Sequence, residues 1–283
     1  MTPGDRSSLT RHLTAHGARW ARGGFLLSEH FHLGLLLETP HAFFEAFLAG
    51  VETEEEAVGP LLPPIERSQE VWAAGVTYLR SREARTAESQ VKDVYEKVYD
   101  AERPELFFKA IGARVVGHGM KIRVRADSRW NVPEPELCLV LNRELSIVGY
   151  SVGNDVSSRD IEGENPLYLP QAKVYDGSCA LGPGIRLAVP DQLRDLSIVL
   201  EVRRGSRLVF KGETRSSSMK RSLEDLAGYL GRELSFPEGA FLLTGTGIVP
   251  PEDFNLSPGD RVSIDVGGLK LENDVATSHE GRE

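Results

Sequence analysis

The sequence is poor in cysteine and contains no long apolar run. Cys138 and Cys179 are the only cysteines among 283 residues, too few for a disulfide framework. No stretch approaches the roughly 20 apolar residues that cross a bilayer, and the first residues lack the charged-then-apolar pattern of an export signal. These features predict a cytoplasmic protein in which Cys138 is a reduced, buried thiol.

Positive charge is also in short supply. The chain carries 42 acidic residues against 33 Lys and Arg, a formal net charge of −9. Such a charge argues against nonspecific binding of nucleic acid, whose phosphate backbone is itself anionic. It does not exclude a small anionic substrate, because a local cation dominates the field of its own site. A content of 40% hydrophobic and 27% charged residues is ordinary for a globular chain of one large or two modest domains.

Residues 1–65 differ from the rest in their sequence pattern and are predicted to form a small N-terminal domain. Apolar runs at 25–27 and 33–37 predict two short strands, and the stripe of apolar residues in 40–51 predicts a helix. Residues 51–58 are acidic, and three prolines between 60 and 64 indicate a linker. A larger second domain is therefore expected over residues 66–283.

Strands dominate the second half of the chain. The pattern predicts one hairpin over 196–211 and another over 261–272. Helices are expected near 222–233 and, with a mostly polar surface, near 86–100. Because strands and helices do not alternate in a regular repeat, the pattern favours an α+β fold over a doubly wound one.

Acidic side chains mark two strands that are adjacent in the sequence. If residues 134–141 form a strand, Glu134 and Glu136 share one face with Cys138. The next strand, near 147–152, delivers Asp155 after a Gly-Asn turn. Three converging carboxylates repel one another unless a cation compensates them, and oxygen ligands favour Mg²⁺, with Mn²⁺ or Ca²⁺ possible. The plainer alternative is a solvated strand face followed by a turn.

Five blocks of the sequence resemble the signature blocks of the fumarylacetoacetate hydrolase superfamily, in their usual order. They are Glu134-x-Glu136, residues 149–160, Lys173-x-x-Asp176, Leu181-Gly182-Pro183 and residues 243–247. The resemblance covers residues 70–276. It implies an α+β fold with a mixed β-roll catalytic domain, a divalent cation bound by Glu134, Glu136 and Asp155, and a homodimer or homotetramer.

Further stretches resemble one branch of that superfamily, the 2-keto-3-deoxy-D-arabinonate dehydratases. They lie at residues 72–85, 94–99, 103–109 and 161–173. Members of this branch remove water from a 2-keto-3-deoxy sugar acid to give 2-oxoglutarate semialdehyde. The resemblance therefore implies a Mg-dependent hydro-lyase of pentose degradation, in which Lys173 and Glu105 flank the metal.

One departure separates this chain from the hydrolase and decarboxylase members. They carry Asn-Tyr-x-x-His-x-x-Glu after the first catalytic strand, where the His-Glu pair activates water. Here Ser81 and Ala84 stand at the His and Glu positions, and neither Glu83 nor His118 lies at a matching place. Hydrolysis is thereby disfavoured. Acylpyruvate hydrolysis, 2-oxo acid decarboxylation, retro-aldol cleavage and a noncatalytic cation site remain alternatives.

A 2-keto acid can chelate a divalent cation, which as a Lewis acid stabilises the enolate formed when a C3 proton leaves. Lys173 is the candidate base, and Glu105 can orient it or protonate the departing C4 hydroxyl; the two roles can also be reversed. The plainer interpretations are that Lys173 pairs with Asp176 or lies on the surface, and that Glu105 caps a turn after Pro104.

Candidate substrate contacts come from two loops. Arg80, Ser81 and Arg82 follow a predicted strand, and the guanidinium groups could bind the substrate carboxylate in a bidentate fashion. Gly245 and Thr246 follow an apolar strand, and their amides and hydroxyl could bind substrate oxygens. The alternatives are exposed side chains on a helix and a plain turn.

Overall fold

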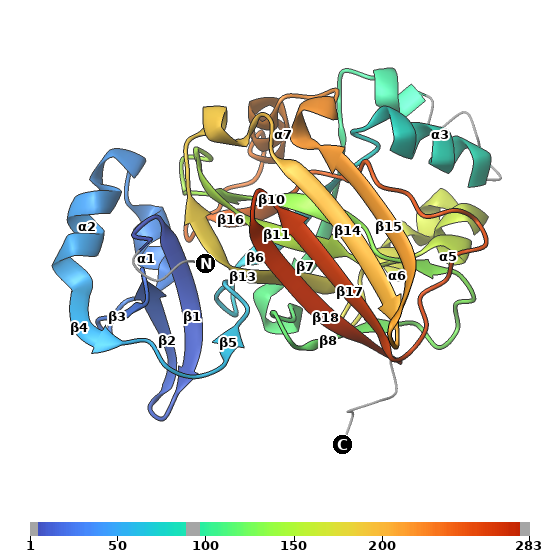
Figure 1. The fold of residues 1–283 in the computed structure, drawn as a ribbon. Coiled ribbons are helices and arrows are strands. Elements are labelled where there is room, and N and C mark those ends of the chain that lie inside the picture. Colours follow the sequence, from blue (N-terminus) through green and yellow to red (C-terminus); the bar gives the residue numbers. More distant parts are fainter. Residues whose placement is uncertain (1–4, 89–96, 278–283) are drawn as a thin grey trace.

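The computed structural model describes residues 5–88 and 97–277, which form two packed β-sheets with helices around them (Figure 1). Within these residues the larger sheet has 11 strands. In spatial order they are β4 (Glu52–Glu56), β3 (Phe25–Leu27), β2 (Gly17–Arg22), β1 (Ser8–Thr14), β13 (Cys179–Leu187), β11 (Ile147–Asp155), β10 (Pro135–Leu141), β16 (Ala240–Leu243), β6 (Glu70–Gly75) and β7 (Glu105–Ile111), with β5 (Leu61–Leu62) paired to β1.

The second sheet has five strands among the described residues. They are β15 (Arg207–Arg215), β14 (Ser197–Arg204), β17 (Asp260–Val266), β18 (Leu269–Thr277) and β8 (Lys121–Val124). A short pair, β9 (Asn131–Val132) and β12 (Ser157–Ser158), lies apart from both sheets. Most pairings are antiparallel, but β16 with β6 and β18 with β8 are parallel, so both large sheets are mixed. The expected α+β fold and the two hairpins are confirmed.

Strand β10 separates two apolar layers. Leu137, Leu139 and Leu141 belong to the core that the two sheets share, while Cys138 and Val140 belong to a second core on the opposite face. This division follows from the period of two along a strand. Cys138 is fully buried and free, as predicted, and burial raises its pKa well above the usual range.

The helices are short and flank the sheets. They are α1 (Leu33–Glu38), α2 (Phe44–Val51), α3 (Leu79–Glu88), α5 (Arg159–Glu164), α6 (Leu169–Lys173) and α7 (Leu223–Leu230), with 3₁₀ turns at His41–Phe43, Gly112–Arg114, Pro166–Tyr168, Pro190–Leu193 and Ser216–Ser218. Helix α7 begins after Ser222, whose side chain accepts a hydrogen bond from the Asp225 amide. Much of the helix expected near 86–100 falls at residues 89–96, outside the described part.

The expectation of a strand at 33–37 is wrong, because these residues form α1. Leu33, Leu36 and Leu37 are buried, whereas Leu35 is 45% exposed. That pattern has helical rather than strand spacing. The run was too short for its period to be evident from the sequence.

The N-terminal segment continues the large sheet. Strand β1 pairs with β13, so β1 to β4 extend the sheet beyond the strands of the second half. Leu9 and Trp20 share their core with Cys138 and Leu243. The division at residues 65 and 66 stays a prediction, and the sheet runs across it.

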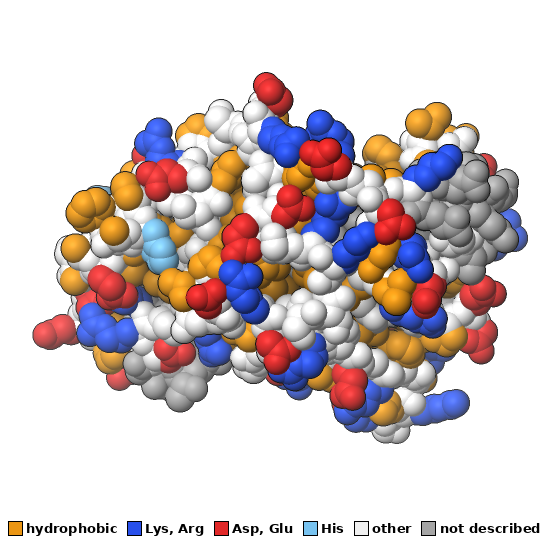
Figure 2. All heavy atoms as spheres, turned by 90° about the horizontal axis from the view of Figure 1, so that it is seen from above, with side chains coloured by type: hydrophobic (Ala, Val, Ile, Leu, Met, Phe, Trp, Pro, Cys, Tyr) orange, Lys and Arg blue, Asp and Glu red, His pale blue; other side chains and the backbone are white. Residues whose placement is uncertain are grey.

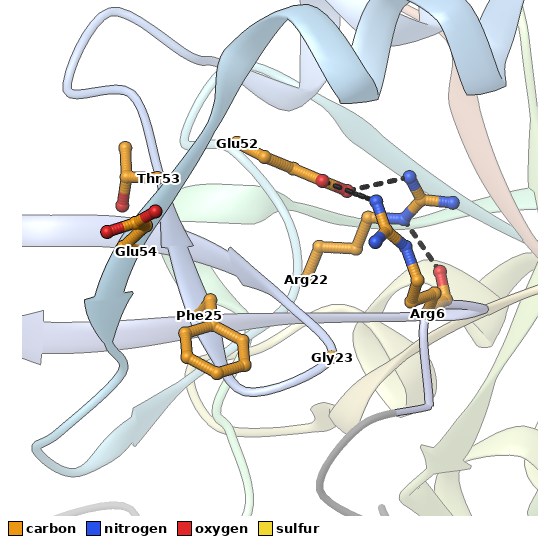
Figure 3. A pocket seen from close by; sticks show the side chains of 7 residues that line it. All are labelled: Arg6, Arg22, Gly23, Phe25, Glu52, Thr53 and Glu54. Atoms are coloured by element: carbon orange, nitrogen blue, oxygen red, sulfur yellow. Dashed lines mark hydrogen bonds and ion pairs between the residues drawn. The ribbon is translucent and has the colours of Figure 1, made fainter.

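A buried guanidinium ties this segment together. The side chain of Arg22, on β2, is 2% exposed and bonds the carboxylates of Glu45 on α2 and Glu52 on β4. Arg6 also pairs with Glu52, and the side chains of Arg6, Arg22 and Glu52 line one pocket (Figure 3). The hydrogen bonds to Arg22 draw down the pKa of Glu45. Glu45 and Glu52 thus already neutralise the positive charges of Arg22 and Arg6 that would otherwise attract an anionic ligand.

Acidic and basic side chains are interspersed over the face seen in Figure 2. Among the helices of residues 5–88 and 97–277, none is long and apolar enough to span a bilayer.

Candidate active site

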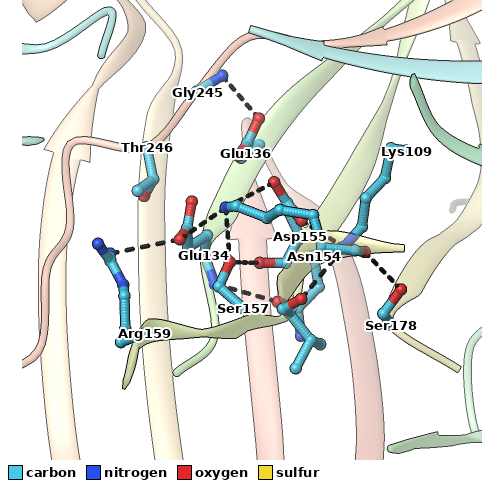
Figure 4. Close-up of polar contacts among 12 residues, drawn as sticks. Lys109, Glu134, Glu136, Asn154, Asp155, Ser157, Arg159, Ser178, Gly245 and Thr246 are labelled. Atoms are coloured by element: carbon cyan, nitrogen blue, oxygen red, sulfur yellow. Dashed lines mark hydrogen bonds and ion pairs between the residues drawn. The ribbon is translucent and has the colours of Figure 1, made fainter. Parts of the chain in front are cut away.

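Three buried carboxylates meet at the end of two paired strands. Glu134 immediately precedes β10, Glu136 lies within it, and Asp155 ends β11. The strands pair so that Glu136 lies opposite Gly153, and the Asp155 amide donates to the carbonyl of Glu134 at 3.0 Å. One oxygen from each carboxylate lies within 4.8 Å of the other two. The arrangement expected from strand alternation is therefore present (Figure 4).

Glu136 shows the electrostatic cost of this cluster. Burial, reinforced by the negative charges of Asp155 and Glu134, raises its pKa well above the usual range. The Gly245 amide donates to Glu136 Oε2 at 2.6 Å and partly offsets the rise. Gly245 has φ = +86°, and a Cβ there would stand 2.2 Å from Thr77 Oγ1, so glycine permits this close approach.

Lys173 is inserted into the acidic cluster. Its Nζ lies 3.0 Å from Glu134 Oε1 and 3.0 Å from Asp155 Oδ2, and it donates to Ser157 Oγ at 2.6 Å. The side chain is 2% exposed. The interpretation that Lys173 lies on the surface is therefore wrong.

Two further cations, which sequence reasoning missed, complete the cluster. Lys109 Nζ lies 2.5 Å from Asp155 Oδ1, and Arg159 Nη2 lies 3.3 Å from Glu134 Oε1. Both side chains are fully buried. Only the position of Lys109 between apolar residues of β7 gave a signal, because a buried ammonium requires a counter-charge.

A narrow cavity opens beside these groups. Its described lining includes Glu105, Phe107, Glu134, Asp155, Glu162 and Lys173. Glu105 begins β7 and Phe107 follows two residues later, so both extend from one face of the strand. The Lys173 ammonium lies 5.6 Å from the centre of the Phe107 ring. The cavity thus places Glu105 and Lys173 around one space.

Further lining residues come from the end of β6, from α3 and from the loop after β16. They include Gly75, Val76, Ser81, Gly245 and Thr246. Val76 has φ = +53°, which is rare for a β-branched residue and marks local backbone strain. The chain turns sharply here to enter α3.

The predicted substrate contacts divide into two groups. Ser81, Gly245 and Thr246 line the cavity, although the Ser81 hydroxyl also donates to the Tyr78 carbonyl at 2.8 Å. Arg80 and Arg82 are not among the described residues of its lining. The Arg80 side chain is 61% exposed and pairs with Glu83, and Arg82 lies over the ring of Tyr99.

Neither substitute for the missing water-activating pair lies at the site. Glu83 is exposed on α3, and His118 accepts a hydrogen bond from the Glu272 amide at 3.2 Å. Glu162, which the sequence interpretation passed over, is buried and lines the cavity from α5.

The acidic cluster fits a hard divalent cation. All three candidate donors are carboxylate oxygens, as Mg²⁺ prefers, and their spacing allows them to share one ion. Burial and the negative charges of Asp155 and Glu134 raise the pKa of Glu136 despite the opposing charge of Lys173, and a bound cation would favour its carboxylate form. The cluster could therefore hold a metal with Glu134, Glu136 and Asp155 as ligands.

The comparison with protein families decides the wider relationship. The model described as "Fumarylacetoacetate (FAA) hydrolase C-terminal" matches residues 70–276. The chain belongs to this family. The match begins at β6 and ends within β18, so it contains every carboxylate and lysine of the site.

Relatives within the family have narrower names. The chain is 50% identical to a protein of Haloferax volcanii named "Probable 2-keto-3-deoxyxylonate dehydratase", over 74% of this chain and 73% of that one. It is 45% identical to the 2-dehydro-3-deoxy-D-arabinonate dehydratase of Saccharolobus solfataricus, over 74% and 70%. A solved structure of 2-keto-3-deoxy-D-arabinonate dehydratase with magnesium and 2,5-dioxopentanoate is 34% identical, covers 96% of this chain and 100% of its own, and gives a TM-score of 0.77.

Proposed function

We propose that this protein is a metal-dependent dehydratase that converts a 2-keto-3-deoxy pentonate into 2,5-dioxopentanoate, also called 2-oxoglutarate semialdehyde. The observation that carries the proposal is the position of Lys173, whose Nζ lies 3.0 Å from oxygens of two candidate metal ligands. Identities of 45–50% to two dehydratases of such acids support the substrate class.

Magnesium is the cation we propose, with manganese or calcium as alternatives. It is the ion in the related dehydratase structure, and Glu134, Glu136 and Asp155 would hold it here. When bound, the cation acts as a Lewis acid toward the keto and carboxylate oxygens of the substrate, which makes the C3 protons more acidic.

Lys173 and Glu105 then divide the proton transfers. Lys173 takes a proton from C3, and Glu105 donates one to the C4 hydroxyl, which leaves as water; the reverse assignment uses the same two groups. Elimination leaves a C3=C4 double bond; loss of a C5 proton with protonation at C3 shifts it to a C4=C5 enol, which tautomerises to the C5 aldehyde. The net change is the loss of one water, so no oxidant or co-substrate is needed.

The rest of the cavity would hold the substrate. Gly245 and Thr246 line the cavity, and the Thr246 hydroxyl could contact the substrate oxygens, whereas the Gly245 amide already donates to Glu136. Ser81 adds a further polar group. Arg80 and Arg82 would reach the cavity only if their side chains left the partners that they now contact.

Product identity tests the proposal. Purified protein is incubated with Mg²⁺ and 2-keto-3-deoxy-D-arabinonate, which is the same compound as 2-keto-3-deoxy-D-xylonate, and the products are followed by ¹H NMR. We expect 2,5-dioxopentanoate to accumulate as the substrate disappears. Pyruvate plus glycolaldehyde would instead show retro-aldol cleavage, and release of CO₂ would show decarboxylation.

We also propose a cellular compartment and an oligomeric state for the enzyme. The free, buried Cys138 and Cys179 suit the reducing cytoplasm. We propose a homodimer or homotetramer because the family resemblance implies one. Size-exclusion chromatography with light scattering tests this oligomeric state.

A further inference from the structure

Lys109 is a buried residue that has no role in the proposed reaction. It lies at an irregularity in the pairing of β6 with β7, where Trp72 is opposite Phe108 and Val71 is opposite Ala110. Lys109 is therefore the extra residue on β7. Such bulges redirect side chains and are common beside active sites.

Its ammonium is fully engaged. Nζ lies 2.5 Å from Asp155 Oδ1 and donates to the main-chain carbonyls of Val156, at 3.1 Å, and Lys173. The contact with Asp155 is an ion pair, and the two carbonyls accept hydrogen bonds. The side chain is 0% exposed and is not among the described residues that line the cavity. Lys109 thus lies behind Asp155 rather than in the space for a substrate.

The two oxygens of Asp155 are divided between two lysines. Oδ1 faces Lys109, and Oδ2 faces Lys173 on the side of the cavity. A carboxylate held through one oxygen cannot rotate freely. The other oxygen therefore keeps a fixed direction toward Lys173 Nζ, 3.0 Å away.

We propose that Lys109 is a positioning residue of the metal site. It locks the Asp155 carboxylate so that Oδ2 is presented to the cation, and it fixes the main chain of Lys173 where α6 ends. This role rests on the proposed function, because it assumes that Asp155 is a metal ligand. Groups that hold metal ligands in this way typically change metal affinity by about 10–100-fold when they are removed.

The sign of the effect separates positioning from simple electrostatics. If Lys109 acted only as a nearby positive charge, its removal would strengthen the binding of a divalent cation, because like charges repel. If it positions Asp155, its removal weakens binding, because Asp155 is then free to turn toward Lys173.

The experiment compares Mg²⁺ affinity by isothermal titration calorimetry of metal-stripped wild type and Lys109→Met, with folding checked by circular dichroism. We expect the dissociation constant to rise by about 10–100-fold. An unchanged or lower value would overturn the proposal. Lys109→Gln, which retains one donor group, carries the same test if the Met variant does not fold, and a smaller rise is expected.

Ser178→Ala is the matched control. The Ser178 hydroxyl donates to the Lys173 carbonyl at 2.8 Å, so it shares this partner with Lys109, and it accepts a hydrogen bond from the Tyr175 amide at 3.3 Å. We expect the Mg²⁺ dissociation constant of this variant to stay within about twofold of wild type, well below the loss typical of a removed ligand partner. An equal loss in both variants would assign the effect to the main chain and overturn the role at Asp155. Wild-type protein that binds Mg²⁺ but forms no product would contradict the proposed function alone.

Discussion

The carboxylate of Glu105 lies directly against Gly75, its pairing partner across β6 and β7. A Cβ at residue 75 would stand 1.9 Å from Glu105 Oε2, a distance that no real contact permits. Glycine at this position therefore lets Glu105 occupy the cavity.

Gly75→Ala is expected to displace Glu105 without touching the acidic cluster. A misplacement of about 1 Å in a catalytic group can cost about 10²-fold, so kcat should fall by that order while Mg²⁺ affinity stays near wild type. Steady-state kinetics and calorimetry measure the two effects. Gly50→Ala is the control, because its added Cβ meets nothing within 4 Å. Equal kcat values for both variants would show that Glu105 takes no part in the reaction.

Lys173→Met should lower kcat by about 10²–10⁴-fold, the usual contribution of a general base. The variant removes the amine while it keeps the length of the side chain. Lys211→Met provides the comparison, since Lys211 pairs with Glu201 on an exposed hairpin. A Lys173→Met enzyme as active as wild type would show that another group takes the proton from C3.

The raised pKa of Glu136 predicts a pH dependence of metal binding. A carboxyl whose folded-state pKa exceeds its unfolded value stabilises the fold fully below the unfolded pKa, and this stabilisation is lost as pH rises through the folded pKa. A cation requires the carboxylate form. The rise in melting temperature that Mg²⁺ produces should therefore be larger near about pH 8 than near about pH 5.

Differential scanning fluorimetry with Mg²⁺ or EDTA measures this difference. In Glu136→Gln the titrating group is gone, and the pH-dependent part of the Mg²⁺ effect should disappear with it. A wild-type protein that Mg²⁺ stabilises equally at both pH values would contradict the assignment of Glu136 as a ligand.

Arg22→Met tests how the N-terminal segment is held. The change removes charged hydrogen bonds to Glu45 and Glu52, each worth about 1.5–3 kcal/mol, so the free energy of unfolding should fall by at least that much. Urea denaturation measures it. Arg194→Met breaks a solvent-exposed cluster with Asp191 and Glu224 and should leave the stability unchanged. A similar loss of stability in both variants would show that the buried ion pairs of Arg22 stabilise the fold no more than the exposed ones of Arg194.

The sequence was most informative where a short-range rule applied. Alternation along one strand placed Glu134 and Glu136 on the same face, and their meeting with Asp155 is confirmed. The Gly-Asn turn expected before Asp155 is wrong, because both residues pair within β11, which runs on to Asp155. The order of the family blocks supplied Lys173. It could not supply Lys109 or Arg159, because their ion pairs join residues on separate elements and depend on the tertiary fold.

Local pattern was least informative in short apolar runs and at the surface. Residues 33–37 satisfy both helix and strand preferences, and packing against Phe44 and Leu48 in one core accompanies the helix. Arg80 and Arg82 follow β6 as expected, but the direction in which α3 leaves the strand decides where they point. That direction depends on the positive φ of Val76, and no sequence pattern predicted this backbone conformation.

The central claim is that dehydration requires a cation held by the three carboxylates. The most direct test strips the protein with EDTA and then adds Mg²⁺ in steps while the formation of 2,5-dioxopentanoate is followed. The account predicts no turnover in the stripped protein, recovery in wild type, and none in Glu136→Gln at the same Mg²⁺ concentrations. Undiminished turnover in EDTA, or full recovery of the Gln variant, would contradict it.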